Sequence, residues 1–208
     1  MLFLFTKKCL PFINVRYYLW YNYPMNKSRV EALTDGIFAV VMTLTVLEFK
    51  VPEDGNLFSH HMLLLLLIYV TTFVALASIW NAHHQIMSFL KQTKVDELIL
   101  WANHLVLLVV CLFPFVTVAH AEHPESTSAS ISYVVIYLLT WLVLICFSEL
   151  IYRVCNKSET LRLRNKQRLR IFFIFLLPGA LISLFWLYAL PIVTLLMAIS
   201  WGRHIEFD

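Results

Sequence analysis

The feature that most constrains this chain is a series of apolar stretches about 20 residues long, the length that a helix needs to cross a bilayer. Hydrophobic residues make up 60% of its 208 residues, and charged residues only 14%. Soluble domains average roughly 45–50% and about 25%, so a water-soluble fold of this length cannot cover so much apolar surface. A soluble enzyme and a nucleic-acid-binding domain are therefore excluded. The sequence predicts an all-α, polytopic membrane protein.

Six transmembrane helices are predicted, at about residues 30–49, 62–89, 98–119, 131–154, 168–185 and 187–201. The last two come from one apolar stretch that is too long for one span and short for two. Pro178 and Pro191 interrupt this stretch. A single kinked helix there would instead give five spans.

Basic residues are distributed unequally between the predicted loops. With six spans, all of the 16 Lys and Arg residues except Lys50 fall on one side. The positive-inside rule places that side, and both termini, in the cytoplasm. The basic run 153–170 could be read as a nucleic-acid patch, but a cytoplasmic loop that touches anionic lipid is favoured. No nucleic-acid partner is predicted.

Residues 1–24 are aromatic-rich, contain two prolines and lack a helical period. We predict that translation begins at Met25, so that residues 1–24 are an extension that is not native and 25–208 form a single six-span unit. The alternative is a short segment lying on the inner leaflet. No signal peptide is recognised, because the apolar run at the start is too short.

Chemistry-bearing motifs are scarce. The four cysteines show no CxxC spacing, and the adjacent pair His83-His84 would point about 100° apart on a helix, a poor geometry for holding one metal. The sequence also contains no GxSxG elbow and no phosphate-binding glycine loop. We therefore predict no metal site, no cofactor and no enzymatic activity.

The first predicted helix carries two distinct faces. On a helical wheel, Val40 is the centre of a small, apolar stripe about 100° wide. The other members of this stripe are Gly36, Thr43, Leu44 and Leu47. Asp35 lies about 140° away from Val40, so a second face is predicted to bury an acid.

A buried carboxylate needs partners. Asp35 lies near the depth of several polar residues at the ends of the first three predicted spans. The candidates are Arg29, Trp80, Asn81, His83, His84, Asn103 and His104. A polar cluster joining these spans is predicted, with a role in helix packing. Ion binding or proton relay is the alternative role.

The segment RVEALTDG, from Arg29 to Gly36, resembles the RxxxFSD signature of the transmembrane-protein-175 family of potassium channels. The resemblance continues in FAVVMTLTVLEFKVP, in TTFVALASIWNAHH and in DELILWANHLVLLVVCLFPFVT, and covers about residues 25–120. Leu33-Thr34 stand where the family has Phe-Ser, and Val40 stands where Ile is usual.

This resemblance implies a homotetramer in a bacterial plasma membrane, with the first helix of each subunit lining a pore for potassium. By position, the constriction falls on Val40, with Thr43 beside it and Leu44 and Leu47 further outward. A motif and packing network would hold the pore helix. It consists of Arg29, Leu33, Thr34, Asp35, Trp80, His84 and Asn103.

Apolar rings replace the usual carbonyl filter in this interpretation, since TVGYG is absent. The function expected is a potassium-preferring cation leak with modest selectivity. One alternative is a proton-coupled secondary transporter that uses Asp35 and the membrane histidines. The other is a membrane assembly protein without flux. The position of Asp35 off the midplane and the lack of internal repeats favour the channel.

Overall fold

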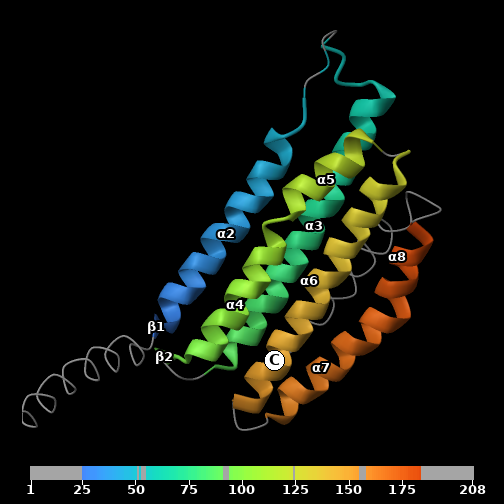
Figure 1. The fold of residues 1–208 in the computed structure, drawn as a ribbon. Helices are drawn as coiled ribbons and strands as arrows, with labels where there is room; N and C mark the ends of the chain where they lie inside the picture. Colours follow the sequence, from blue (N-terminus) through green and yellow to red (C-terminus); the bar gives the residue numbers. More distant parts are fainter. Residues whose placement is uncertain are drawn as a thin grey trace, which may run out of the picture.

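Long helices dominate the computed structural model, which describes residues 25–50, 52, 55–90, 94–123, 125–154 and 158–183. They run side by side as one bundle (Figure 1). In chain order the helices are α2 (Lys27–Leu47), α3 (His60–Ser88), α4 (Glu97–Val110), α5 (Phe113–Glu122), α6 (Thr127–Val154), α7 (Glu159–Ile171), the π-helix η1 (Phe172–Leu176) and α8 (Leu177–Ser183).

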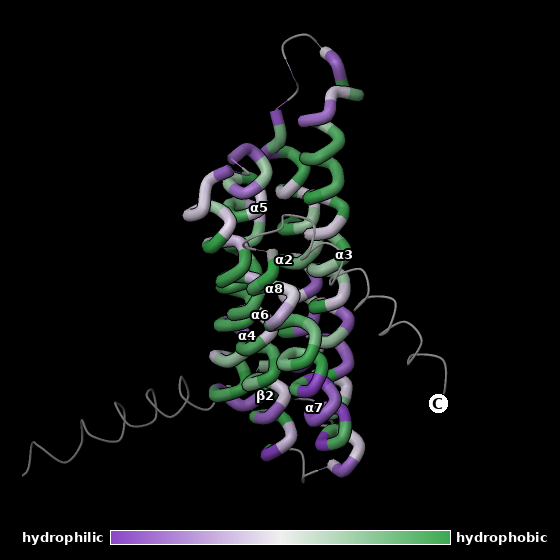
Figure 2. The backbone as a smooth tube through the Cα atoms, turned by 90° about the vertical axis from the view of Figure 1, so that its right-hand side faces the viewer, coloured by the Kyte–Doolittle hydropathy of each residue, from purple (hydrophilic) through white to green (hydrophobic). Residues whose placement is uncertain are grey.

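Within the described part of the chain, four helical segments are long and apolar enough to cross a membrane: Lys27–Leu47, His60–Ser88, Glu97–Glu122 and Thr127–Val154. The bundle is hydrophobic through its middle and hydrophilic at both ends (Figure 2). The predicted all-α, multi-pass membrane class is confirmed. The predicted fifth span, 168–185, falls on the helix that runs from α7 to α8 and is described to Ser183. The predicted sixth span, 187–201, and residues 1–24 lie outside the described residues.

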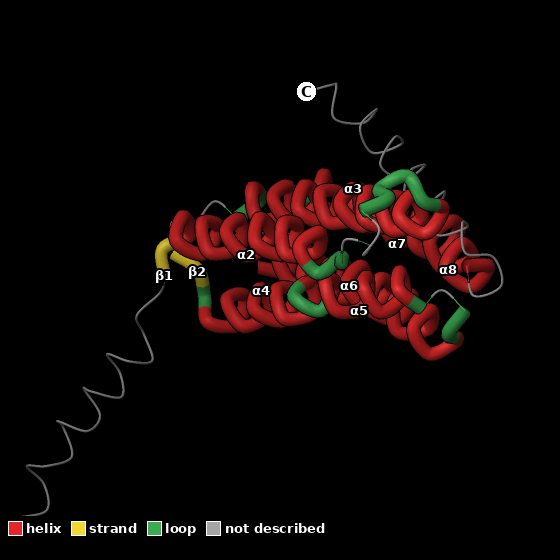
Figure 3. Tube along the Cα trace, turned by 90° about the horizontal axis from the view of Figure 1, so that it is seen from above, coloured by secondary structure: helices red, strands yellow, loops and turns green. Residues whose placement is uncertain are grey.

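Two very short strands accompany the helices. β1 (Met25–Asn26) pairs antiparallel with β2 (Lys94–Val95), just before α2 and α4 begin (Figure 3). The side chain of Asn26 then caps α2 by accepting a hydrogen bond from the Ser28 amide at 3.1 Å. Strands of two residues are too short to show an alternating pattern, so no sequence signal predicts them.

The third predicted span is divided in the structure. α4 ends at Val110, Cys111 and Leu112 form a turn, and α5 begins at Phe113 with Pro114 in its first turn. Proline has no amide hydrogen, and inside a helix its ring clashes with the carbonyl four residues earlier. A break at this position follows from Pro114, whereas the sequence analysis treated 98–119 as continuous.

Pro178 has a related effect in the last described helix. The residue four positions before it is Ile174, which lies within the π-helical segment η1. The wider π-turn separates the proline ring from a carbonyl that it would meet in a regular α-helix. The helix thereby continues through the proline to Ser183.

α2 lies at one side of the bundle and the α7–α8 helix at the other (Figure 1). α2 packs on α3, α4 and α5, while α6 packs on the opposite side of these three helices and carries α7 and α8. The core between them is aliphatic and aromatic. Its fully buried members include Leu76, Ile79, Val106, Phe113, Tyr137 and Leu144.

Candidate pore-lining face and its polar anchors

One face of α2 holds the helix on the bundle. Its buried side chains recur every three or four residues, as expected for one side of an α-helix. They are Val30, Thr34, Phe38, Val41 and Thr45. Thr34 and Thr45 satisfy their hydroxyl groups by donating to backbone carbonyls four residues earlier, at 2.9 and 2.8 Å. Two threonines can therefore lie in this apolar contact without a lost hydrogen bond.

The opposite side of α2 is uncovered in the single chain. Val40 is 53% exposed, Leu44 42% and Leu47 75%. Gly36 and Thr43 on the same side are also exposed. These five residues, the stripe that the helical wheel outlined, are called the α2 stripe below.

Thr43 brings a hydroxyl to the α2 stripe. Its Oγ1 lies 3.0 Å from the carbonyl oxygen of Ala39 and 2.9 Å from that of Val40. The hydroxyl proton is donated to the helix backbone, which leaves the oxygen lone pairs as acceptors. It is the one side-chain oxygen among the five residues of the α2 stripe.

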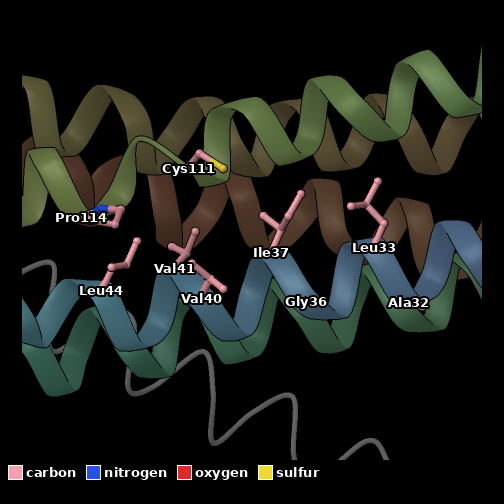
Figure 4. Close-up of a pocket in the computed structure, with 9 residues that line it drawn as sticks. All are labelled: Ala32, Leu33, Gly36, Ile37, Val40, Val41, Leu44, Cys111 and Pro114. Atoms are coloured by element: carbon pink, nitrogen blue, oxygen red, sulfur yellow. The ribbon is translucent and has the colours of Figure 1, made fainter.

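A shallow groove of about 420 Å³ runs beside the α2 stripe. Leu33, Ile37, Val41 and Leu44 point from α2 toward the α4–α5 turn, where Cys111 and Pro114 form the other wall (Figure 4). The lining is apolar. Gly36, Val40 and Leu44 belong to both the groove and the α2 stripe, so the break before Pro114 lies close to the exposed face of α2.

Asp35 has one partner among the predicted candidates. The indole Nε1 of Trp80, on α3, donates to Asp35 Oδ1 at 2.8 Å. The prediction that this acid is buried is wrong for the single chain, because Asp35 is exposed. It lies beside the packing face of α2, where its carboxylate reaches α3 and still meets solvent.

The polar cluster that is fully buried centres on Asn103 of α4, which is 0% exposed. His83 Nε2 of α3 lies 2.6 Å from Asn103 Oδ1, and Asn103 Nδ2 donates to Thr34 Oγ1 of α2 at 3.1 Å. Thr34 in turn donates to the Val30 carbonyl. This chain of hydrogen bonds joins α2, α3 and α4 and satisfies polar groups that would be costly to bury alone.

The remaining candidates stand apart from this cluster. Arg29 is exposed, and no ion pair joins it to Asp35 in the described part of the chain. The two residues are six positions apart, about 240° around the helix, so they lie on different sides. His84 stacks on Trp80 at 5.9 Å between ring centroids, and His104 tilts against Trp101 at 5.7 Å. Leu33 lines the groove.

His83 is more central to the helix contacts than the motif predicted, since the predicted packing network did not include it. Its ring is 2% exposed and stacks on Phe147 of α6, with centroids 5.2 Å apart and planes at 4°. It therefore links the polar cluster to the helix on the far side of the bundle. The only sequence signal was its presence among the possible partners of Asp35, since a stacking contact across helices leaves no local pattern.

The sequence also gives little indication that Lys27 contacts another helix. It donates to the Leu90 carbonyl at 3.0 Å and lies 3.5 Å from Glu31. This contact joins the first turn of α2 to the end of α3. Its signal was weak, because a lysine at a predicted membrane boundary usually faces headgroups or water.

The chain is similar in sequence to several known proteins. The profile of the family described as endosomal/lysosomal potassium channel TMEM175 matches residues 29–114. A potassium channel from Chryseobacterium sp. is 30% identical over 185 residues, covering 85% of this chain and 93% of that protein. A potassium channel from Streptomyces collinus is 38% identical over 112 residues, covering 51% of this chain and 53% of that protein.

A solved structure has the same fold. The crystal structure of a lysosomal potassium-selective channel TMEM175 homologue from Chamaesiphon minutus superposes with a TM-score of 0.69 at 26% sequence identity. The match covers 87% of this chain and 98% of that one. Vertebrate relatives named endosomal/lysosomal proton channel TMEM175, such as the human protein at 31% identity, are longer, and the match covers 26% of that protein.

The fold and these relatives define a multi-pass α-helical membrane protein of an ion-channel class. More particularly, the chain belongs to the TMEM175 family of potassium channels. This family is not a class of enzymes.

Proposed function

We propose that the chain is a potassium-preferring cation leak channel in which four copies surround a pore lined by α2. The observation that carries the proposal is the α2 stripe: Val40, Leu44 and Leu47 are exposed on the side opposite the packing face. Four such helices around an axis would bring these side chains together as stacked apolar rings. Relatives named as potassium channels support the choice of ion.

An apolar ring conducts only while it is wide enough to stay hydrated, and narrowing it expels water and stops ions. Valine at position 40 sets the width of the narrowest ring in this proposal. Such a ring supplies no oxygen ligands, so an ion must keep most of its water or lose it without replacement. Potassium gives up water more readily than sodium, which favours potassium modestly.

The polar contacts of α2 with α3 and α4 act on this pore indirectly, by orienting α2. The Thr34–Asn103–His83 cluster and the Trp80–Asp35 bond fix the rotation of α2 against α3 and α4. Rotation of α2 determines which residues face the axis. In this proposal these residues position the pore helix and do not contact the ion.

Orientation and assembly belong to the same proposal. We place both termini in the cytoplasm of a bacterial cell, following the unequal distribution of Lys and Arg. β1, the end of α3 and the start of α4 lie at one end of the bundle, in keeping with helices that cross the membrane in alternation.

The transporter alternative has less support. Secondary transporters commonly build their ion site from broken helices near the midplane. The helix that carries Asp35 is continuous from Lys27 to Leu47.

Reconstitution of the full chain in liposomes tests the proposal. A channel gives discrete single-channel current steps, with potassium flux exceeding sodium flux, and a native mass four times that of the 24.3 kDa chain. Slow flux that requires a proton gradient would favour the transporter. A folded protein without ion flux would favour the assembly role.

A further inference from the structure

The last described helix changes character along its length. Its first part, α7, is rich in Arg and Lys, whereas η1 and α8 are apolar. From Thr160 to Ser183 the chain contains neither Asp nor Glu. The basic residues of α7 are Arg162, Arg164, Lys166, Arg168 and Arg170. A concentrated positive charge thus meets an apolar surface within one helix.

Buried polar contacts fix the rotation of α7 on α6. Leu161, Asn165 and Arg168 are buried. Arg168 Nη1 donates to Ser148 Oγ at 2.8 Å and to Asn165 Oδ1 at 3.2 Å, and Ser148 also donates to Asn165. These bonds hold one face of α7 against α6, so the opposite face is directed away from the bundle.

Two of the other basic side chains are already engaged. Arg162 pairs with Glu159 at 3.4 Å, and the Arg164 guanidinium lies 5.5 Å from the centre of the Phe89 ring. Lys166 and Arg170 are exposed on the outward face, and no ion pair joins either of them to another residue of the described chain.

The outward face becomes apolar directly beyond these two charges. Phe173, Ile174 and Phe175 are each about 60% exposed. Lys166, Arg170 and Ile174 follow at four-residue intervals, so they lie nearly in line along the helix. In a multi-pass membrane protein, exposed apolar side chains of this kind contact acyl chains. The adjacent positive charges then lie at the level of the headgroups.

We propose that Lys166 and Arg170 form a binding site for the phosphate of an anionic phospholipid, whose acyl chains lie along Phe173 and Ile174. Arginine suits this role because its planar guanidinium can donate two parallel hydrogen bonds to phosphate oxygens. The site is built by the fold, since the Ser148–Asn165–Arg168 contacts direct both charges outward. Removing the charge of either Lys166 or Arg170 lowers the affinity for anionic lipid about fivefold.

The full chain in lipid nanodiscs provides the test. Discs of phosphatidylcholine are compared with discs of the same acyl chains that contain phosphatidylglycerol, and bound lipid is counted by native mass spectrometry. The chain should retain phosphatidylglycerol selectively and unfold at a higher temperature in its presence. The double variant Lys166→Gln/Arg170→Gln should lose both effects.

Arg164→Gln is the matched control, because it removes the same charge as Arg170→Gln from the same helix but from a side chain that lies over the Phe89 ring, away from the outward face. It should leave lipid selectivity unchanged. Arg170→Lys, which keeps the charge, should retain most of it. The single variants decide the question if the double variant does not fold.

Absence of phosphatidylglycerol selectivity in the unaltered chain overturns the proposal. So does equal selectivity in Arg170→Gln and the unaltered chain. Soluble glycerol phosphate that stabilises the chain equally well in phosphatidylcholine discs would assign the surface to a water-soluble anion instead. None of these measurements depends on ion conduction.

Discussion

Val40 illustrates how much one side chain can matter when symmetry repeats it. It is half-exposed on the free side of α2, and in the proposed tetramer four copies form one ring. Asp35 and Trp80 show the other kind of residue, a polar pair that orients the helix. The two kinds predict different consequences of substitution.

Val40→Ala should raise single-channel conductance and bring sodium permeability closer to that of potassium. The reason is that two methyl groups per subunit are lost from the narrowest ring, which widens it and lowers its dewetting barrier. Reversal potentials in mixed potassium and sodium solutions measure the change.

Thr45 provides the control, since it is 1% exposed on the packing face and bonds to the Val41 carbonyl. Thr45→Ala should leave the permeability ratio unchanged. Cysteine at position 47 should react with small water-soluble thiol reagents, and cysteine at 45 should not. An unchanged ratio in Val40→Ala, or equal reactivity at 45 and 47, would remove α2 from the pore.

Trp80→Phe and Asp35→Ala should each lower the free energy of unfolding by about 1 kcal/mol, the net value of a side-chain hydrogen bond. Because each change breaks the same 2.8 Å contact, the double variant should be less destabilised than the sum of the two. Thermal unfolding in detergent measures all three. Strictly additive losses would show that the indole and the carboxylate do not interact in the assembled protein.

At the scale of the element, α2 depends on a buried amide that belongs to another helix. Asn103 of α4 connects α2 and α3 through Thr34 and His83. An amide suits this place because it offers an acceptor to one neighbour and a donor to the other. The helices are thereby held in one rotational register, which apolar packing alone defines less sharply.

Asn103→Leu should destabilise the bundle by about 1–3 kcal/mol, because the His83 ring would be left buried without its 2.6 Å partner. Asn81→Leu is the matched control: it is the same substitution on α3, but Asn81 is exposed. Its effect should stay within about 0.5 kcal/mol. Similar losses in the two variants, measured by thermal unfolding, would contradict a structural role for the cluster.

In the whole molecule, Met25 and Asn26 are the first described residues, and both are tied to the helix bundle. These residues form β1, which pairs with β2, and Asn26 caps α2. A chain of residues 25–208 should therefore assemble and conduct like the full chain. Native mass spectrometry and liposome flux measure the two properties.

A shorter chain of residues 27–208 serves as the comparison, because it lacks β1 and the cap. It should unfold with about 1 kcal/mol less stability, the usual contribution of a helix cap. If residues 25–208 fail to assemble while the full chain does so, residues 1–24 belong to the folded unit and the predicted start is wrong.

The membrane class and the free face of α2 can both be derived from the sequence. Both follow from periodicity: apolar stretches of bilayer length give the spans, and about 100° per residue places Val40, Leu44 and Leu47 on one side. Burial of Thr34, Phe38 and Thr45 on the other side agrees with that wheel. The motif around Arg29–Asp35 added the family, which the comparisons show.

The contacts between polar groups, in contrast, depend on how the helices pack. The choice of Trp80 as the partner of Asp35, the position of His83 between Asn103 and Phe147, and the outward direction of Lys166 and Arg170 all depend on helix rotation. Rotation is set by contacts between segments far apart in the chain, and these leave no periodic signal within one segment. Sequence periodicity identifies a helix face, whereas packing selects what that face contacts.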